Sequence, residues 1–123
     1  MELTIGGTVY QFKFGMGFLK SINKEYTTSV EGVSGAKKEV GLRYAVINLM
    51  DGDIKTLIHV LDLGNVGFSP RITVKDIEEY IDDEDTDIDA LFDQVLDFLG
   101  KANATKKTVA DLEEAIAKAR ENQ

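Results

Sequence analysis

The segment LTIGGTVYQFKF, residues 3–14, constrains the fold more than any other part of the chain. Two short runs of alternating apolar and polar residues flank Gly6 and Gly7, a pair typical of the tight turns that join antiparallel strands. A two-residue loop sets Leu3 opposite Tyr10. This register gathers on one side the apolar residues Leu3, Ile5, Tyr10, Phe12 and Phe14. Turn chemistry and side-chain alternation therefore predict the same β-hairpin.

An isolated hairpin is marginally stable in water, so its apolar face needs a cover. Apolar residues at helical spacing downstream predict helices near residues 18–26, 40–50, 53–64, 74–81, 88–99 and 108–122. The polar stretch 27–39 is expected to be a mobile connection. The predicted fold is mainly α (α+β), with an N-terminal β-hairpin packed on a bundle of about six helices. The predicted single domain, 1–123, comprises a hairpin (1–14), a helical core (15–101) and a peripheral C-terminal helix (108–123).

Several residues are candidates for helix ends. Asp53 is a predicted N-cap and Gly64 a predicted C-terminal stop. A Thr-x-x-Asp pattern predicts three further helix starts with capping boxes, at the pairs Thr73 and Asp76, Thr86 and Asp89, and Thr108 and Asp111. The helix near 40–50 is apolar almost all round, so we expect it to be the most buried helix.

Acidic residues are concentrated in one part of the chain. The net charge is −8, and residues 76–100 contain eleven carboxylates and no lysine or arginine. Such a stretch repels phosphate backbones, so nucleic acid is excluded as a ligand, whereas a basic protein partner is compatible. The N-terminus lacks a basic start and a continuous apolar run, so neither a signal peptide nor a membrane span is expected.

The most acidic segment, YIDDEDTDIDALFDQ, raises the possibility of a calcium loop. An EF-hand needs glycine at position 6 and glutamate at position 12 of its loop. Neither residue is in place when the loop starts at Asp83 or at Asp85. We therefore predict a solvated acidic turn and helix face, with no metal or cofactor site.

No group of residues suggests catalysis. The chain has no cysteine, which removes thiolate chemistry and disulfides. His59 is the only histidine, and no nucleophile is recognisable for it to activate, so we interpret it as structural. The glycines of GMGFLKS and GVSGAKKE lack the remaining residues of phosphate-binding loops. The sequence therefore predicts a protein that is not an enzyme.

Apolar and acidic surface positions remain as candidates for partner binding. Val9 lies on the polar side of the hairpin, Phe68 follows the helix near 53–64, and the last helix has a thin apolar stripe. Carboxylates recur every four residues on the helix near 88–99. The candidate partner-binding residues are Val9, Phe68, Asp89, Asp93, Asp97, Leu112 and Ile116.

The order of three segments resembles a known family. MELTIGGTVYQFKFGMGFLKSINKEY, then GLRYAVINLMDGD, then ITVKDIEEYIDDEDTDIDALFDQVLDFLGKANATKK resemble the tail assembly chaperones of long-tailed phages and prophages of Gram-positive bacteria. The resemblance extends from Glu2 to about Lys107. The segments YQFKFGMGFLKSIN and EYIDDEDTDIDALFDQVL carry most of it.

The resemblance implies a virion-morphogenesis factor without catalytic activity. Members of this family are thought to coat the long tape measure protein, keep it soluble and help tail tube subunits assemble around it. Many are also made in a longer version by a translational frameshift, whose extension recruits the tube protein; this chain would be the short version. The implied location is the cytoplasm of the bacterial host, and the protein is expected to be absent from the mature virion. Self-association fits the need to coat a long client with many copies.

Two readings from other classes stay open. A small acidic adaptor or regulatory protein would dock on a basic partner through its acidic helix, with salt-sensitive binding. An enzyme with an unfamiliar site is the third class.

Overall fold

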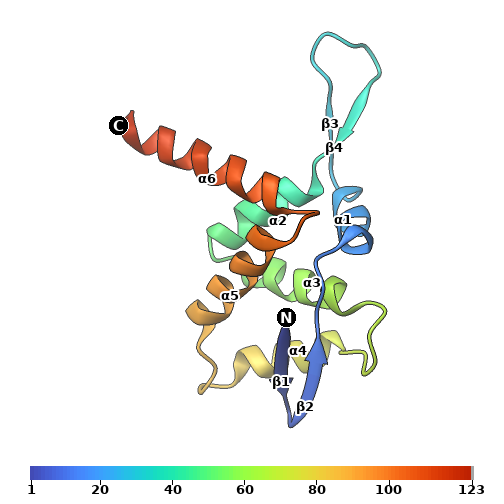
Figure 1. Ribbon diagram of the computed structural model, residues 1–123, viewed down its shortest axis with the longest axis vertical. Helices are drawn as coiled ribbons and strands as arrows, with labels where there is room; N and C mark the ends of the chain where they lie inside the picture. The colour runs from blue at the N-terminus through green and yellow to red at the C-terminus, as the bar shows by residue number, and fades with distance from the viewer. Residues whose placement is uncertain (123) are drawn as a thin grey trace.

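The computed structural model describes residues 1–122. Two antiparallel hairpins and six helices follow one another along the chain (Figure 1). Their bounds are β1 Glu2–Ile5, β2 Thr8–Gln11, α1 Met16–Asn23, β3 Thr27–Ser29, β4 Lys37–Glu39, α2 Gly41–Met50, α3 Ile54–Asn65, α4 Val74–Asp82, α5 Ile88–Lys101 and α6 Lys106–Glu121. The predicted class, an α+β fold with an N-terminal hairpin on about six helices, is confirmed.

The first hairpin has the predicted register. Leu3 pairs with Tyr10 and Ile5 with Thr8. Gly6 and Gly7 have φ angles of 58° and 80°, which glycine adopts without steric cost. The apolar side of the ribbon is buried and the other side is exposed, as the alternation predicted.

Helix α3 forms the centre of the helical part. It contacts α1, α2, α4 and β2, and Leu57, Val60 and Leu61 are fully buried. Lys55 is its only exposed residue, whereas α2 exposes Tyr44 and Ile47. The prediction that the helix near 40–50 is the most buried was therefore wrong. Apolar residues are distributed all around α2, but neighbouring elements cover only one side of this helix.

A single cluster of buried side chains connects the first hairpin with all six helices. The exit of the hairpin is tied to α3, because Lys13 N donates a hydrogen bond to Gly64 O at 2.8 Å. Gly64 itself lies inside α3, which ends at Asn65, so its prediction as a helix stop was wrong. A Cβ at Gly64 would lie 2.8 Å from Phe14 Cε1, so glycine allows the hairpin to approach the helix closely.

A second hairpin occupies the stretch predicted to be a mobile connection. Strands β3 and β4 pair antiparallel, with Thr28 opposite Lys38. This hairpin, residues 27–39 and hereafter the arm, extends from the end of the molecule opposite the first hairpin (Figure 1). Tyr26, predicted to close the first helix, instead lies in the extended chain that enters the arm. Its ring is 5.1 Å from that of Tyr44, centroid to centroid. The segment 15–101 is thus not purely helical.

Two of the four predicted N-terminal caps are confirmed. Asp53 accepts from Thr56 N, and Thr73 forms a capping box with Asp76. The helix start predicted at Thr86 was wrong by one residue, and the start predicted at Thr108 was wrong by three. Helix α5 is capped by Asp87, whose side chain accepts from Ala90 N at 3.0 Å. Helix α6 begins at Lys106, before Thr108.

Candidate protein-binding surfaces

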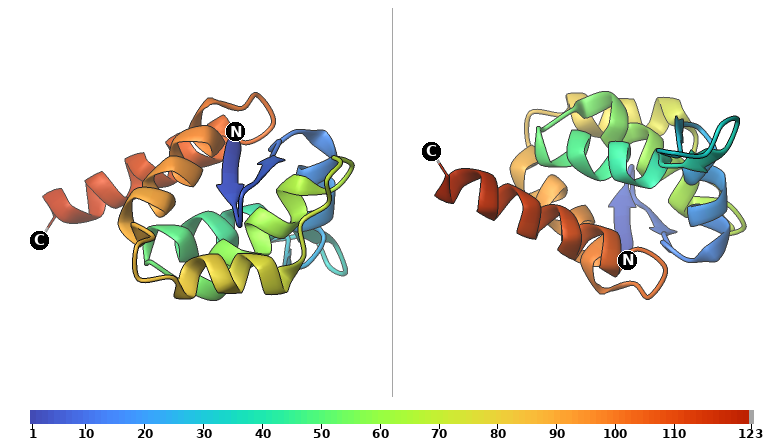
Figure 2. Two further views of the ribbon diagram at one scale, coloured as in Figure 1. Left: turned by 90° about the horizontal axis from the view of Figure 1, so that it is seen from below. Right: turned by 90° about the horizontal axis from the view of Figure 1, so that it is seen from above.

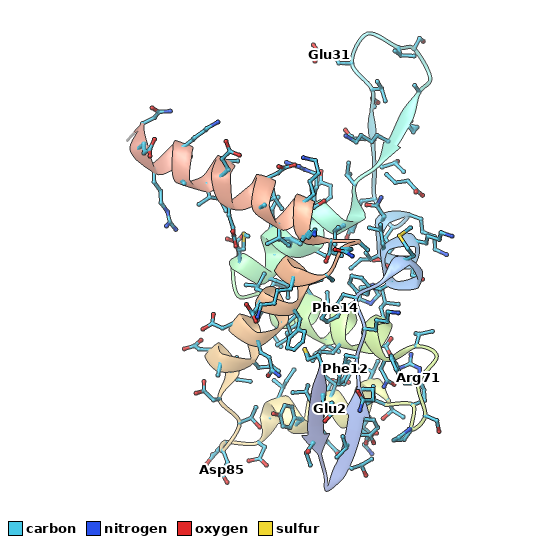
Figure 3. The ribbon with its side chains drawn as sticks, viewed as in Figure 1. Glu2, Phe12, Phe14, Glu31, Arg71 and Asp85 are labelled. Carbon is cyan, nitrogen blue, oxygen red and sulfur yellow. The ribbon has the colours of Figure 1, made fainter. Side chains whose placement is uncertain are left out.

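The acidic loop between α4 and α5 lies at the far end of the molecule from the arm (Figure 3). Two of its carboxylates accept hydrogen bonds from backbone groups: Asp83 Oδ1 accepts from Asp85 N at 2.9 Å, and Asp87 caps α5. The Thr86 hydroxyl donates to Tyr80 O and closes the turn. Among residues 1–122, no three His, Cys, Asp or Glu side chains are placed to hold one metal ion. The loop geometry is that of a helix entry.

The predicted acidic row lies on the exposed side of α5. Asp89, Asp93 and Asp97 are all exposed. Lys101 Nζ lies 2.8 Å from Asp97 Oδ2, so one end of the row is partly neutralised. The row offers a negatively charged helix face to the solvent.

His59 on α3 is paired with a residue that sequence spacing did not indicate. Its Nε2 lies 2.7 Å from Glu25 Oε2 and 2.9 Å from Glu25 Oε1. Glu25 is 34 residues away, in the connection after α1, so only the folded chain brings them together. The pair links two elements at the surface, with the His59 side chain 44% exposed.

Phe68 lies where the sequence suggested an apolar contact point. It lines a hollow of about 490 Å³ between the start of α1 and the end of α3. We call this the Phe68 hollow; its apolar lining includes Met16, Phe18, Leu63, Val66 and Phe68. Val66 is 58% exposed and Met16 is 58% exposed, so an apolar strip is open to solvent there.

A second and larger hollow, about 640 Å³, was not predicted. We call it the Phe98 hollow; its apolar lining includes Phe12, Phe14, Met16, Phe98, Ala102 and Ala104. The hairpin exit forms one wall, and the connection from α5 to α6 forms the other. Residues more than eighty positions apart meet here, which is why spacing in the sequence gave no signal. Met16, Gly15 and Lys13 separate the two hollows and line both.

The charge around these two hollows differs from that of the rest of the surface. Neither has a carboxylate among its described lining residues; Lys13 lines both, and Lys101 lines the Phe98 hollow. Three other hollows each have two or three carboxylates, for example Asp93, Asp97 and Glu113 between α5 and α6. In a chain with net charge −8, these two apolar hollows are thus less acidic than the other three.

The remaining predicted contact residues divide by exposure. Val9 is 48% exposed on the outer side of the first hairpin, as a single apolar side chain among polar ones. Leu112 is only 4% exposed because α6 packs it into the core, so the prediction that it contacts a partner is corrected. Ile116, one helical turn further along α6, is 36% exposed.

No helix within residues 1–122 is both long enough and apolar enough to cross a bilayer. In a comparison with known proteins, the family model described as phage tail assembly chaperone protein, TAC, matches residues 2–114. No curated protein and no solved structure matches the chain. The family model covers nearly all of the sequence, including both hairpins, α1 to α5 and the buried half of α6. The chain belongs to the phage tail assembly chaperone family.

Proposed function

We propose that this chaperone binds the tape measure protein of its phage, keeps that protein soluble and promotes assembly of the tail tube around it. The observation that carries the proposal is the family match over residues 2–114. The chemistry is consistent with it, because a chaperone for a long helical client needs exposed apolar contacts and no catalytic cleft.

The Phe68 hollow is the surface we assign to the tape measure protein. It exposes Val66 and Met16 beside Phe68, at a place without carboxylates and next to Lys13. An amphipathic helix buries its apolar stripe in such a hollow, and acidic residues beside that stripe would meet the lysine. Elsewhere the acidic surface would repel an acidic client and keep the complex soluble.

The same proposal includes the tail tube protein as a second partner, recruited by a frameshifted longer form of the chain. The chaperone acts in the cytoplasm of the bacterial host, by binding alone, and leaves before the virion is complete. These points rest on the family resemblance.

Co-expression tests the proposal. The chaperone and the tape measure protein of the same phage are produced together, and the soluble fraction of the tape measure protein is measured. We expect a gain of about tenfold or more over the tape measure protein alone, because binding covers apolar helix faces that otherwise aggregate. The absence of any gain would reject the proposed function.

A matched pair of variants tests the assigned surface. Val66→Asp places a charge in the Phe68 hollow, and Val33→Asp places the same charge at a valine of similar exposure in the arm, 58% against 55%. Only Val66→Asp should lower the soluble yield of the tape measure protein. Equal yields from both variants would reject the Phe68 hollow as the client surface while leaving the function itself standing.

The exposed row Asp89, Asp93 and Asp97 favours a second candidate function, an acidic adaptor that docks on a basic protein. Reversal of all three charges to lysine would abolish such docking. If that variant still raises the soluble yield of the tape measure protein to the wild-type level, the row does not mediate client binding.

A further inference from the structure

The second half of α6 extends beyond the body of the molecule. Every residue from 113 to 122 is exposed, and the helix points away from the other elements in all views (Figure 2). Val109 and Leu112 are buried at 3% and 4% exposure, while Ile116 continues the same face of the helix without cover. Residues four apart lie above one another on a helix, so an apolar stripe runs from the core into solvent.

The Phe98 hollow lies at the other end of the same helix. Ala102 and Ala104, just before α6, form part of its wall. The helix has 16 residues, so its free end is about 24 Å away from its beginning. A continuous helix cannot bend back over that distance, and the free end of α6 therefore cannot reach the hollow of its own chain.

We propose that the free end of α6 docks in the Phe98 hollow of a second copy of this chain. Ile116 would enter the apolar hollow, with Ala119 one turn further along the same face. Glu113, three residues before Ile116, borders the stripe and has no ionic partner among the described residues. Lys13 at the rim of the hollow likewise has none within residues 1–122. The two unpaired charges are complementary.

This contact joins two different surfaces of identical chains. A contact of that kind leaves one free helix end and one free hollow, so it repeats without closing unless the rotation forms a ring. Each chain would bind the next at the start of that chain's own α6, and a row of copies results. The inference rests on the proposed function, because a row of chaperones suits a long client.

The contact is expected to be weak. Nine residues of α6 extend from the body, whereas stable interfaces use about 20–30 residues on each side. Association of the isolated chain should therefore be reversible and depend on concentration, with a dissociation constant of about 10 μM or weaker. Along a client, copies bound side by side would raise their effective concentration and favour the row.

The first experiment measures the mass of the purified chain by sedimentation over about 10 μM to about 1 mM. The wild type should rise above the 13.6 kDa of one chain, and Ile116→Asp should remain at that mass. The control is Val74→Asp on α4, a residue of comparable exposure, 43% against 36%, far from both surfaces. It should behave as the wild type. A wild type that stays monomeric, or an Ile116→Asp variant that still associates, would overturn the proposal.

A mixing experiment tests whether the two surfaces differ. Phe98→Asp blocks the hollow but keeps the helix end, and Ile116→Asp does the reverse; both residues are at least 36% exposed, so the fold should tolerate the changes. Each variant alone should be monomeric. Their mixture should form a heterodimer with one chain of each variant and nothing larger. Only one intact helix end and one intact hollow are present in such a pair. A mixture that stays monomeric would overturn the contact.

Reversing the charges of Lys13 and Glu113 tests how the helix end is oriented in the hollow. Lys13→Glu and Glu113→Lys should each weaken association about fivefold, and the double variant should recover it, since every copy then carries the reversed pair. A double variant as weak as the single ones would overturn this docking. All three measurements use the chain alone. A negative result in them therefore does not bear on client binding, which the co-expression assay tests separately. A monomeric chain whose Phe98→Asp variant loses client solubilisation would instead identify the hollow as a client surface.

Discussion

The side chain of Asn65 is bonded to the backbone of Gln11: its Nδ2 donates to the Gln11 carbonyl oxygen at 2.8 Å. Its Oδ1 accepts from Ile72 N at 2.7 Å and from Arg71 at 3.2 Å, and the residue is fully buried. Arg71, which lies at the edge of the molecule (Figure 3), also pairs with Asp62. One amide thus joins the first hairpin, the end of α3 and the chain that enters α4.

Asn65→Asp should destabilise the protein by about 2–4 kcal/mol, because it replaces the donor with a carboxylate oxygen that faces the Gln11 carbonyl in a buried site. Urea unfolding followed by circular dichroism measures the change. Asn103→Asp, at an exposed turn, should alter the free energy of unfolding by no more than about 0.5 kcal/mol. Similar losses in both variants would contradict a special role for Asn65.

Gly41→Ala should cost more than about 2 kcal/mol. A Cβ at Gly41 would overlap the Ile22 carbonyl oxygen and lie 2.8 Å from its carbonyl carbon, and backbone atoms of a packed helix cannot move aside cheaply. Gly100→Ala is the control, because its Cβ would meet nothing closer than Val109 Cγ1 at 3.7 Å. That change should stabilise α5 by about 0.5–1 kcal/mol. Thermal melts of the pair should shift in opposite directions, and a shared direction would refute the argument.

Asp87→Ala should destabilise the protein by about 1 kcal/mol through loss of the N-cap of α5. Asp85→Ala removes the same charge from the same loop, but the Asp85 side chain caps no helix. The difference between the two midpoints in urea therefore isolates the cap from general relief of acidic repulsion. Equal midpoints would show that Thr86 or another residue starts the helix.

Amide hydrogen exchange should separate the two hairpins. Apart from the half-buried Ala36, every residue of the arm, 27–39, is exposed, whereas β2 packs on α3. Protection depends on how often a segment opens, so the β4 amides should exchange at least about a hundredfold faster than those of β2. Mass spectrometry of peptides from each strand measures the ratio. Equal protection would mean that the body holds the arm more firmly than its contacts indicate.

The sequence predicted best what neighbouring residues determine. The first hairpin followed from Gly6, Gly7 and strict alternation, and the helices followed from apolar spacing. The arm was missed because its strands, with Lys37 and Lys38 in one of them, bury nothing and so lack the alternation that marks a half-buried strand. Its geometry comes from strand pairing and from Val40 N donating to Tyr26 O at 2.8 Å.

Surfaces built from distant segments could not be predicted. Phe68 was predicted as an apolar contact residue in a loop, and Ile116 as part of the thin apolar stripe of the last helix. The Phe98 hollow depends on how α5 turns into α6 beside the hairpin exit, which no local pattern specifies. Leu112 and Ile116 lie on the same apolar stripe of α6. Leu112 is buried because the core extends beneath it, and Ile116 is exposed because the core ends before it.

The arm also offers a convenient position for a probe. The chain contains no cysteine, so Ser34→Cys near the tip of the arm would create a unique thiol for a fluorescent dye. Ser34 is exposed and lies among residues that do not support the core. A dye there would report, by energy transfer, how closely successive chaperones follow one another on a client, while folding and the proposed contacts stay undisturbed.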